Sequence, residues 1–243
     1  MSSHSQSGGT GGAVAAFLSR YRVAVIAVLG TILAAVILAV VVTTVGASRN
    51  DRALASAEEL QDQYATWRAD LSFADSGEGV PSEQDEDLAA SVAALQEATQ
   101  AVLDDFPNHY AAQRALMIRG QVAMDDRRPD DAIEPFQELA DRFRQSYLAD
   151  VALANVAVAQ EQSGDTAAAL AAWQSLADAE AIQNPLLPRA LFNVGRLSEA
   201  ASDFQAASLA YNRLLDEFPD SQWTALGRNR LLRLQVDGLV SGS

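Results

Sequence analysis

A phrase that recurs along the chain constrains the fold more than any other feature of the sequence. Its clearest form is Leu-Leu-Asp-Glu-Phe-Pro-Asp-Ser, and altered forms of it occur three more times. The four copies begin at Val102, Leu139, Leu176 and Leu214. Phe106 and Phe143, which hold the same place in the first two copies, are 37 residues apart. A fixed period of this length is typical of proteins built from stacked structural repeats.

The signals between these phrases predict pairs of helices. Pro129 stands where a helix would begin, and the two acidic residues that follow it suit the positive end of the helix dipole. Candidate N-caps precede three further helices at Ser146, Asp165 and Ser221. No part of residues 88–237 alternates with the period of a strand. We therefore predict an all-α repeat domain over residues 88–237, an α-solenoid of three to four helix pairs that ends in a capping helix.

The N-terminal part of the chain has a different composition. Residues 1–22 begin with a Ser/Gly-rich stretch that predicts a flexible tail, and residues 23–45 run for 23 positions without a charge. At about 1.5 Å per residue, a helix of that length crosses the hydrocarbon layer of a membrane. We predict a single transmembrane anchor, with the tail in the cytoplasm and the acidic remainder outside it. The alternative is cleavage of a signal peptide near Ala47, which would release a soluble protein.

Residues 46–87 connect the predicted anchor to the repeats. An apolar stripe with alternating spacings of four and three predicts one face of a helix, and its members are Ala53, Ala57, Leu60, Tyr64, Trp67 and Leu71. This helix could extend as a stalk, form a short coiled coil or pack inside the domain, and we favour packing. Residues 74–87 contain two glycines, a proline and six acidic residues, so we predict a solvated acidic loop there.

Small residues occupy matching places in three of the repeats. They fall 12 positions apart in the pairs Gly120 and Ala132, Ala157 and Ala169, and Gly195 and Ala207. In each copy a bulky aromatic residue follows four positions later, at Phe136, Trp173 and Tyr211. Small residues on neighbouring helices allow the helix axes to approach closely. We expect the aromatic side chains to fill the groove between one helix pair and the next.

This register resembles the tetratricopeptide repeat (TPR), a family of paired helices. The family places a small residue on each helix, an aromatic four positions after the second, and a proline after the pair, where Pro107 and Pro219 stand here. The turn at Gly164 matches the family, whereas the turns at Arg127-Arg128 and Ser202-Asp203 depart from it in sequence. The resemblance covers about residues 88–234. With its single predicted anchor, the chain resembles in architecture the ancillary subunit of the Sec translocon, the YfgM type.

The resemblance implies a partner-binding groove lined by the first helix of each pair. Carried over position by position, its residues are Arg114, Met117, Gln121, Val151, Asn155, Val158, Arg189, Phe192, Asn193 and Arg196. Apolar centres with Arg and Asn at the edges suit an extended peptide or a partner helix. Asn155 and Arg189 are similar to part of the family's carboxylate clamp, but Met117 and Gln121 do not supply its other members.

Composition and missing motifs exclude several classes of function. The net charge of −15 opposes binding to nucleic acid phosphates. The chain has no cysteine, which rules out disulfides, thiol nucleophiles and cysteinyl zinc sites, and its two histidines, His4 and His109, are too few for a histidine-based metal site or a catalytic triad. No phosphate-binding loop, metalloprotease motif or hydrolase nucleophile motif occurs. We therefore expect neither an enzyme nor a bound cofactor or metal.

These observations predict a scaffold or adaptor that binds protein or peptide partners. The anchor and the repeats together suggest a single-pass inner-membrane protein whose C-terminal domain is extracytoplasmic (periplasmic). Such a protein would chaperone translocated polypeptides or support a membrane complex that is Sec-associated or assembles the envelope. One alternative is a structural subunit of a cell-envelope machine that has no groove ligand. The other is the soluble periplasmic adaptor that cleavage near Ala47 would leave.

Overall fold

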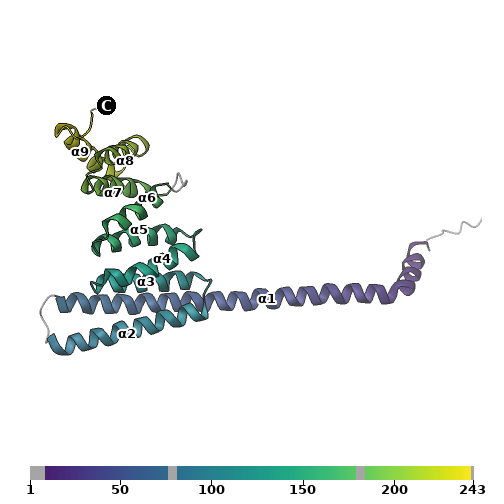
Figure 1. Cartoon of the computed structure of the whole chain (residues 1–243). Coiled ribbons are helices and arrows are strands. Elements are labelled where there is room, and N and C mark those ends of the chain that lie inside the picture. The colour runs from purple at the N-terminus through teal and green to yellow at the C-terminus, as the bar shows by residue number, and fades with distance from the viewer. Residues whose placement is uncertain (1–8, 76–80, 179–183, 242–243) are drawn as a thin grey trace, which may run out of the picture. The chain divides into compact units, whose positions relative to one another are not determined.

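The structure, a computed structural model, describes residues 9–75, 81–178 and 184–241 (Figure 1). Every regular element in these ranges is a helix, as the sequence predicts. The helices are α1 (Gly9–Asp75), α2 (Pro81–Asp105), α3 (Tyr110–Asp125), α4 (Pro129–Arg142), α5 (Tyr147–Gln162), α6 (Thr166–Asp178), α7 (Leu187–Ala200), α8 (Phe204–Glu217) and α9 (Gln222–Val236). The chain divides into two compact units, residues 1–52 and 53–243, and each is described by itself.

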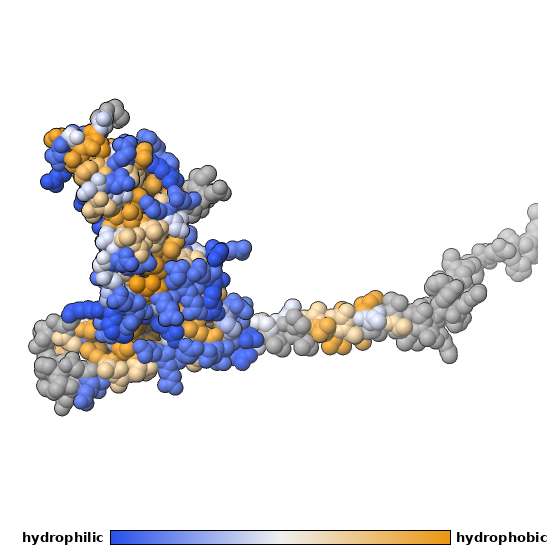
Figure 2. Space-filling view, viewed as in Figure 1, coloured by the Kyte–Doolittle hydropathy of each residue, from blue (hydrophilic) through white to orange (hydrophobic). Residues whose placement is uncertain are grey.

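The first unit contains the N-terminal part of α1. Ile32, Leu33, Ile37 and Leu38 each expose more than half of their surface, and Figure 2 shows uncovered hydrophobic residues along this part of the helix. Within the described residues, none of the helices combines the length and the apolar character that a membrane span requires. The tail of residues 1–8 and the side chains of residues 23–26, 28–30, 41, 42 and 45 lie outside the description. The anchor stays a prediction.

The second unit opens with the C-terminal part of α1 packed in a hydrophobic core. The buried members of the predicted stripe are Ala53, Ala57, Leu60, Tyr64 and Trp67, and Leu71 is partly buried beside them. They share one hydrophobic cluster with side chains of α2, α3 and α4. Of the three roles open to this helix, the structure therefore shows packing inside the domain rather than a stalk or a coiled coil.

The acidic loop predicted over residues 74–87 is largely wrong. α1 continues to Asp75 and α2 begins at Pro81, while residues 76–80 lie outside the description. Proline at the first position of a helix, followed by acidic residues in the first turns, is a favourable helix start because its missing N–H and fixed φ cost nothing there. The sequence pattern places the start of this helix at its first apolar residue, Leu88, but the start signal at Pro81 lies seven residues earlier.

From α3 onward the helices form the predicted pairs. Each helix packs against its neighbours in the chain, and α9 packs against both α7 and α8. Ser146 and Ser221 accept hydrogen bonds from the N–H two residues later, at 3.2 and 3.3 Å. Asp165 and Asp203 accept from the N–H three residues later, at 2.9 and 3.0 Å. These side chains satisfy N–H groups that a helix start leaves open, and so they fix where α5, α6, α8 and α9 begin.

The turn inside each pair has the same backbone geometry in all three repeats. Arg127, Gly164 and Ser202 have φ values of 58°, 88° and 62°. The residue after each donates its N–H to the carbonyl five residues earlier, with N–O distances of 2.8 to 2.9 Å. Gly238, which follows α9, has a φ of 71° and begins the same hydrogen-bonded turn. Arg127 and Ser202 therefore differ from the family's turn in residue type alone. The backbone at both positions adopts the same left-handed conformation as Gly164.

The small residues and the aromatic residues meet inside each helix pair. A Cβ added to Gly120 would lie 2.4 Å from the Phe136 ring, and one added to Gly195 would lie 2.3 Å from the Tyr211 ring. Ala157 belongs to the same buried cluster as Trp173 in the middle repeat. The aromatic side chain thus packs between the two helices of its own pair. The prediction that it fills the groove between one pair and the next is wrong.

Candidate partner-binding groove

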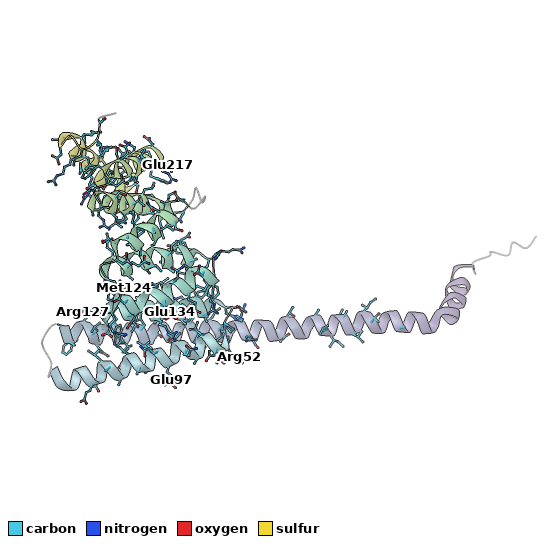
Figure 3. The ribbon with its side chains drawn as sticks, in the orientation of Figure 1. Arg52, Glu97, Met124, Arg127, Glu134 and Glu217 are labelled. Carbon is cyan, nitrogen blue, oxygen red and sulfur yellow. The ribbon has the colours of Figure 1, made fainter. Side chains whose placement is uncertain are left out.

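The predicted groove residues lie on α3, α5 and α7, the first helix of each pair. Figure 3 labels Met124, which belongs to α3. Two of the ten residues are buried, namely Met117 at 2% exposure and Asn193 at 8%. The other eight are partly exposed. The repeat register therefore places the predicted residues on the correct helices, but it does not predict how far each side chain is buried.

The prediction that Met117 and Asn193 line the groove is wrong, because both side chains are buried and have structural roles. Met117 lies in the hydrophobic cluster of the first repeats, and the amide of Asn155 donates to its sulfur at 3.6 Å. Asn193 donates to the carbonyl oxygen of Arg189 at 2.9 Å and accepts from the guanidinium of Arg196 at 2.9 Å. A thioether gains free energy by burial, and a buried amide needs hydrogen-bond partners. Neither side chain is available to a ligand.

Two of the three predicted arginines are held by neighbouring helices. Arg114 on α3 donates to the side-chain oxygen of Gln61 on α1. Arg196 on α7 forms an ion pair with Glu161 on α5, with 2.6 Å between Nη2 and Oε2. Both interactions join the first helix of one repeat to the first helix of the repeat before it. These guanidinium groups therefore tie repeats together.

Arg189, at the start of α7, differs from the other two. Its guanidinium carbon lies 5.2 Å from the centre of the Trp173 ring, and no acidic side chain pairs with it among the described residues. Burial lowers the pKa of Arg189, although a guanidinium stays charged at neutral pH. A cation that is partly removed from water and unpaired is stabilised when a carboxylate approaches, because the charge-assisted hydrogen bonds replace lost hydration.

An aromatic cluster lies three residues further along α7. The ring of Phe192 is 6.2 Å from that of Tyr211 on α8 and 5.3 Å from that of Trp223 on α9. Phe192 and Trp223 are both partly exposed. Residues three apart on a helix lie on one face, so Arg189 and Phe192 present a cation and an apolar ring side by side. Sequence reasoning missed Trp223, because it belongs to the capping helix.

Sequence reasoning also missed a series of ion pairs between first helices. Glu199 on α7 pairs with Arg230 on α9 at 2.7 Å, as Glu161 pairs with Arg196 one repeat earlier. Glu161 and Glu199 are 38 residues apart and so hold the same place in their repeats. Their matching position in successive repeats is the sequence signal from which these ion pairs could have been predicted. Tyr211 lies close to Glu199, and burial followed by this carboxylate raises the pKa of its hydroxyl.

The first repeat is joined to α1 in a related way. The hydroxyl of Tyr64 donates to Asp125 on α3 at 2.7 Å, and Arg68 lies 3.4 Å from the same carboxylate. Burial, followed by the bond to Asp125, raises the pKa of Tyr64. The pair fixes α1 against α3, so the helix after the predicted anchor completes the first repeat.

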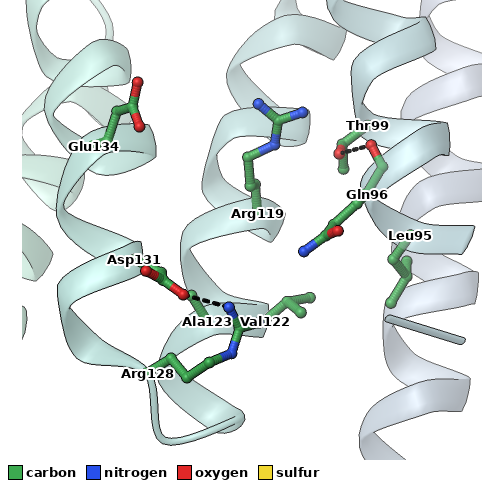
Figure 4. Close-up of a pocket in the computed structure, with 9 residues that line it drawn as sticks. All are labelled: Leu95, Gln96, Thr99, Arg119, Val122, Ala123, Arg128, Asp131 and Glu134. Atoms are coloured by element: carbon green, nitrogen blue, oxygen red, sulfur yellow. Dashed lines mark hydrogen bonds and ion pairs between the residues drawn. The ribbon is translucent and has the colours of Figure 1, made fainter. Parts of the chain in front are cut away.

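A pocket of about 380 Å³ lies between α2, α3 and α4, apart from the predicted groove (Figure 4). Arg119 and Arg128 line it, but Arg119 donates to Gln100 at 2.9 Å and Arg128 pairs with Asp126 and Asp131. Its cations are thus already engaged, and we assign it no ligand. Among the residues that the structure describes, no three acidic or histidine side chains gather in a way that could hold a metal ion.

Comparison with known proteins supports the interpretation of the helix pairs. Residues 189–221, which comprise most of α7, all of α8 and the turn after it, match the family model of the tetratricopeptide repeat. The chain is also 40% identical over 95 residues to a TPR repeat-containing protein of Treponema pallidum (strain Nichols). That stretch covers 39% of each chain, so this chain spans about two fifths of the length of the curated relative. These matches support the tetratricopeptide family, and neither concerns the Sec-associated type.

Proposed function

We propose that the chain is a membrane-anchored scaffold that binds a protein partner through the first helices α5 and α7. Tetratricopeptide repeats are in general protein-interaction domains without enzymatic activity, and the match over residues 189–221 includes α7. The observation that carries the proposal is Arg189, a partly buried cation with no acidic partner among the described residues, three positions before the partly exposed Phe192. Such a pair suits a peptide that supplies a carboxylate and an apolar side chain.

The groove is tested by photocrosslinking in cells that produce the full chain. A photoreactive residue at Phe192 or Val158 should form adducts with a partner, and Arg189→Ala should reduce those adducts about tenfold or more, since a charge-assisted bond contributes about 1.5–3 kcal/mol. The matched control is Arg144→Ala, because Arg144 is 80% exposed in its side chain and its ion pair among the described residues is with Asp141 on its own repeat. Adducts of equal yield in the two variants would refute the groove.

The identity of the adducts separates two forms of the proposal. Adducts with many different translocated polypeptides would support a chaperone role beside a Sec-type or envelope-assembly complex. A single fixed neighbour would instead support the alternative, a structural subunit of a cell-envelope machine. We favour the first form because an unpaired cation beside an aromatic ring recognises chemistry that many peptides share.

The anchoring part of the proposal depends on residues 23–45. This run carries no charge, and the side chains described within it expose large apolar surfaces that water disfavours. An anchored chain should stay with membranes washed at alkaline pH, whereas a soluble chain beginning near Ser48 would refute the anchor. The orientation is tested by Asp87→Cys in intact spheroplasts, because the chain has no other cysteine. Failure of an impermeant maleimide to label it would contradict an extracytoplasmic domain.

A further inference from the structure

The capping helix α9 has every local feature of a first helix, but the residues described after it form no second helix. Ser221 caps it as Ser146 caps α5, and Gly238 ends it with the turn that follows α3, α5 and α7. In those three helices a small residue, Gly120, Ala157 or Gly195, lies seven positions before the turn. On α9 that position is the buried Leu231, and the next residue, Leu232, is 52% exposed.

Leu232 belongs to an uncovered apolar line with basic neighbours. Arg228, Leu232 and Val236 follow one another at four-residue spacing, so they share a face of α9. Val236 is 85% exposed, and Figure 2 shows hydrophobic residues at this end of the repeats. Arg233 stands beside this line with a side chain that is 85% exposed. Between Ser221 and Val236 the sequence contains three arginines and no acidic residue.

The opposite end of the repeats carries a groove of complementary character. A cavity of about 670 Å³ lies between α1 and α2, with Asp62, Asp70 and Glu97 at its sides. Its apolar lining includes the alanines Ala94, Ala98 and Ala101, together with Trp67 and Leu95. A second cavity of about 260 Å³ shares Asp70 and Ser91 with the first, and it adds Asp87 and the half-exposed Phe73. The two cavities therefore form one acidic groove along the α1–α2 hairpin.

No basic residue of the hairpin neutralises this groove. The sequence has none between Arg68 and Arg114, and Arg68 itself is directed to Asp125 on α3. Figure 3 shows Glu97 on the edge of α2 that faces away from α3. Alanines leave room for a helix to approach closely, so the groove suits a helix with exposed leucine or valine and flanking arginines.

We propose that α9 of one copy of this chain docks in the α1–α2 groove of a second copy, head to tail. Leu232 and Val236 would lie on the alanines, while Arg228 and Arg233 would face the groove's Asp and Glu side chains. Pairing of like ends is disfavoured, because two α9 helices would bring arginines together and two hairpins would bring acidic residues together. Each copy has one arginine-bearing face on α9 and one acidic groove on the hairpin, so the contact is heterologous and can extend to further copies.

Disulfide trapping tests this contact directly, since the chain has no cysteine of its own. Full-length Leu232→Cys and Ala98→Cys chains are purified in mild detergent, mixed and oxidised. We expect crosslinked pairs with one chain of each kind and no crosslink when either chain is oxidised alone. The matched control is Leu209→Cys mixed with Ala98→Cys, because Leu209 is 63% exposed on α8 but outside the proposed contact. Crosslinking of Leu232→Cys to itself, or equal crosslinking of the control, would overturn the proposal.

A charge exchange gives an independent test by sedimentation of the full-length chain. Arg228→Glu with Arg233→Glu should weaken self-association about tenfold or more, and so should Asp62→Arg with Glu97→Arg, because each variant places like charges together. A chain that carries all four changes should associate again. The proposal would be overturned if the unmodified chain is monomeric at every concentration. It would also be overturned if the chain with all four substitutions does not regain self-association. Groove crosslinks at Phe192 should persist in every variant, which separates this contact from the proposed function.

Discussion

Replacing Gly195 by alanine tests whether the close approach of α7 and α8 limits the repeat. The added Cβ would lie 2.3, 2.6 and 2.7 Å from three carbons of the Tyr211 ring, whereas carbon atoms in contact are about 3.5–4.0 Å apart. Tyr211 is fully buried, so its ring or the helices must move by about 1 Å or more. Such overpacking costs about 1–3 kcal/mol, and the better helix propensity of alanine returns about 1 kcal/mol. We expect a net loss of about 0–2 kcal/mol, from overpacking less the gain in helix propensity.

The assay is urea unfolding of the full-length chain in detergent, followed by tryptophan fluorescence. Trp173 and Trp223 report on the repeats on either side of Gly195, and stacked repeats can unfold separately, so the low-urea transition is the one to compare. Gly227→Ala is the matched control. Its Cβ would meet mainly the mobile end of Leu214 at 2.9 Å, so it should be neutral or slightly stabilising.

A second substitution identifies the cause of the loss. In a Tyr211→Leu background the ring is gone, and Gly195→Ala should then be neutral or stabilising. The difference between the two backgrounds is the interaction energy of the clash. An equal effect of Gly195→Ala in the two backgrounds would refute the close approach. A loss that persists without the ring would assign the effect to the backbone of α7 instead.

Three further experiments probe the turns and the joints between repeats. Ser202→Gly should raise stability by about 0.5–1 kcal/mol in thermal unfolding, because φ is positive at Ser202; a loss would contradict that geometry. A double-mutant cycle of Glu161→Gln and Arg196→Ala should give a coupling of about 0.5–1 kcal/mol that shrinks at about 1 M salt, since both side chains are about a third exposed; zero coupling would remove the pair as a joint. Tyr64→Phe should lower stability by about 1 kcal/mol at neutral pH through loss of the bond to Asp125. Because the pKa of Tyr64 is raised on folding, its contribution is present below its ordinary value of 10.0 and is lost above it, so the variant should lose less stability at alkaline pH.

Helix starts were predictable because their signals are local. Ser146, Asp165 and Ser221 each bond to an N–H within three residues, so the sequence alone contains both partners. The stripe from Ala53 to Trp67 was predictable for a similar reason, since its spacing fixes one face of a helix whatever that face contacts.

The site was less predictable because its properties depend on residues in other repeats. Arg196 and Glu161 are 35 residues apart, and only the stacking of α7 on α5 brings them together. The depth of Met117 depends in the same way on how α5 covers α3. The turn at Ser202 was unpredictable for a related reason. The packing of the helix pair imposes a positive φ there, and serine as a residue type does not indicate one.

The separate roles of the arginines link the fold to the two proposed surfaces. Arg196 is engaged with Glu161, so substituting it should loosen the joint between repeats and change stability before it changes recognition. Arg189 pairs with no acidic side chain of the described residues, and Arg228 and Arg233 lie on α9, where Leu232 and Val236 are exposed. An acidic partner that reaches these arginines leaves the joints between repeats intact, and at Arg233 it competes with Asp237, which lies 4.0 Å away. Partner binding at Arg189 and self-association at Arg228 and Arg233 should therefore be separable by mutation, each lost while the other persists.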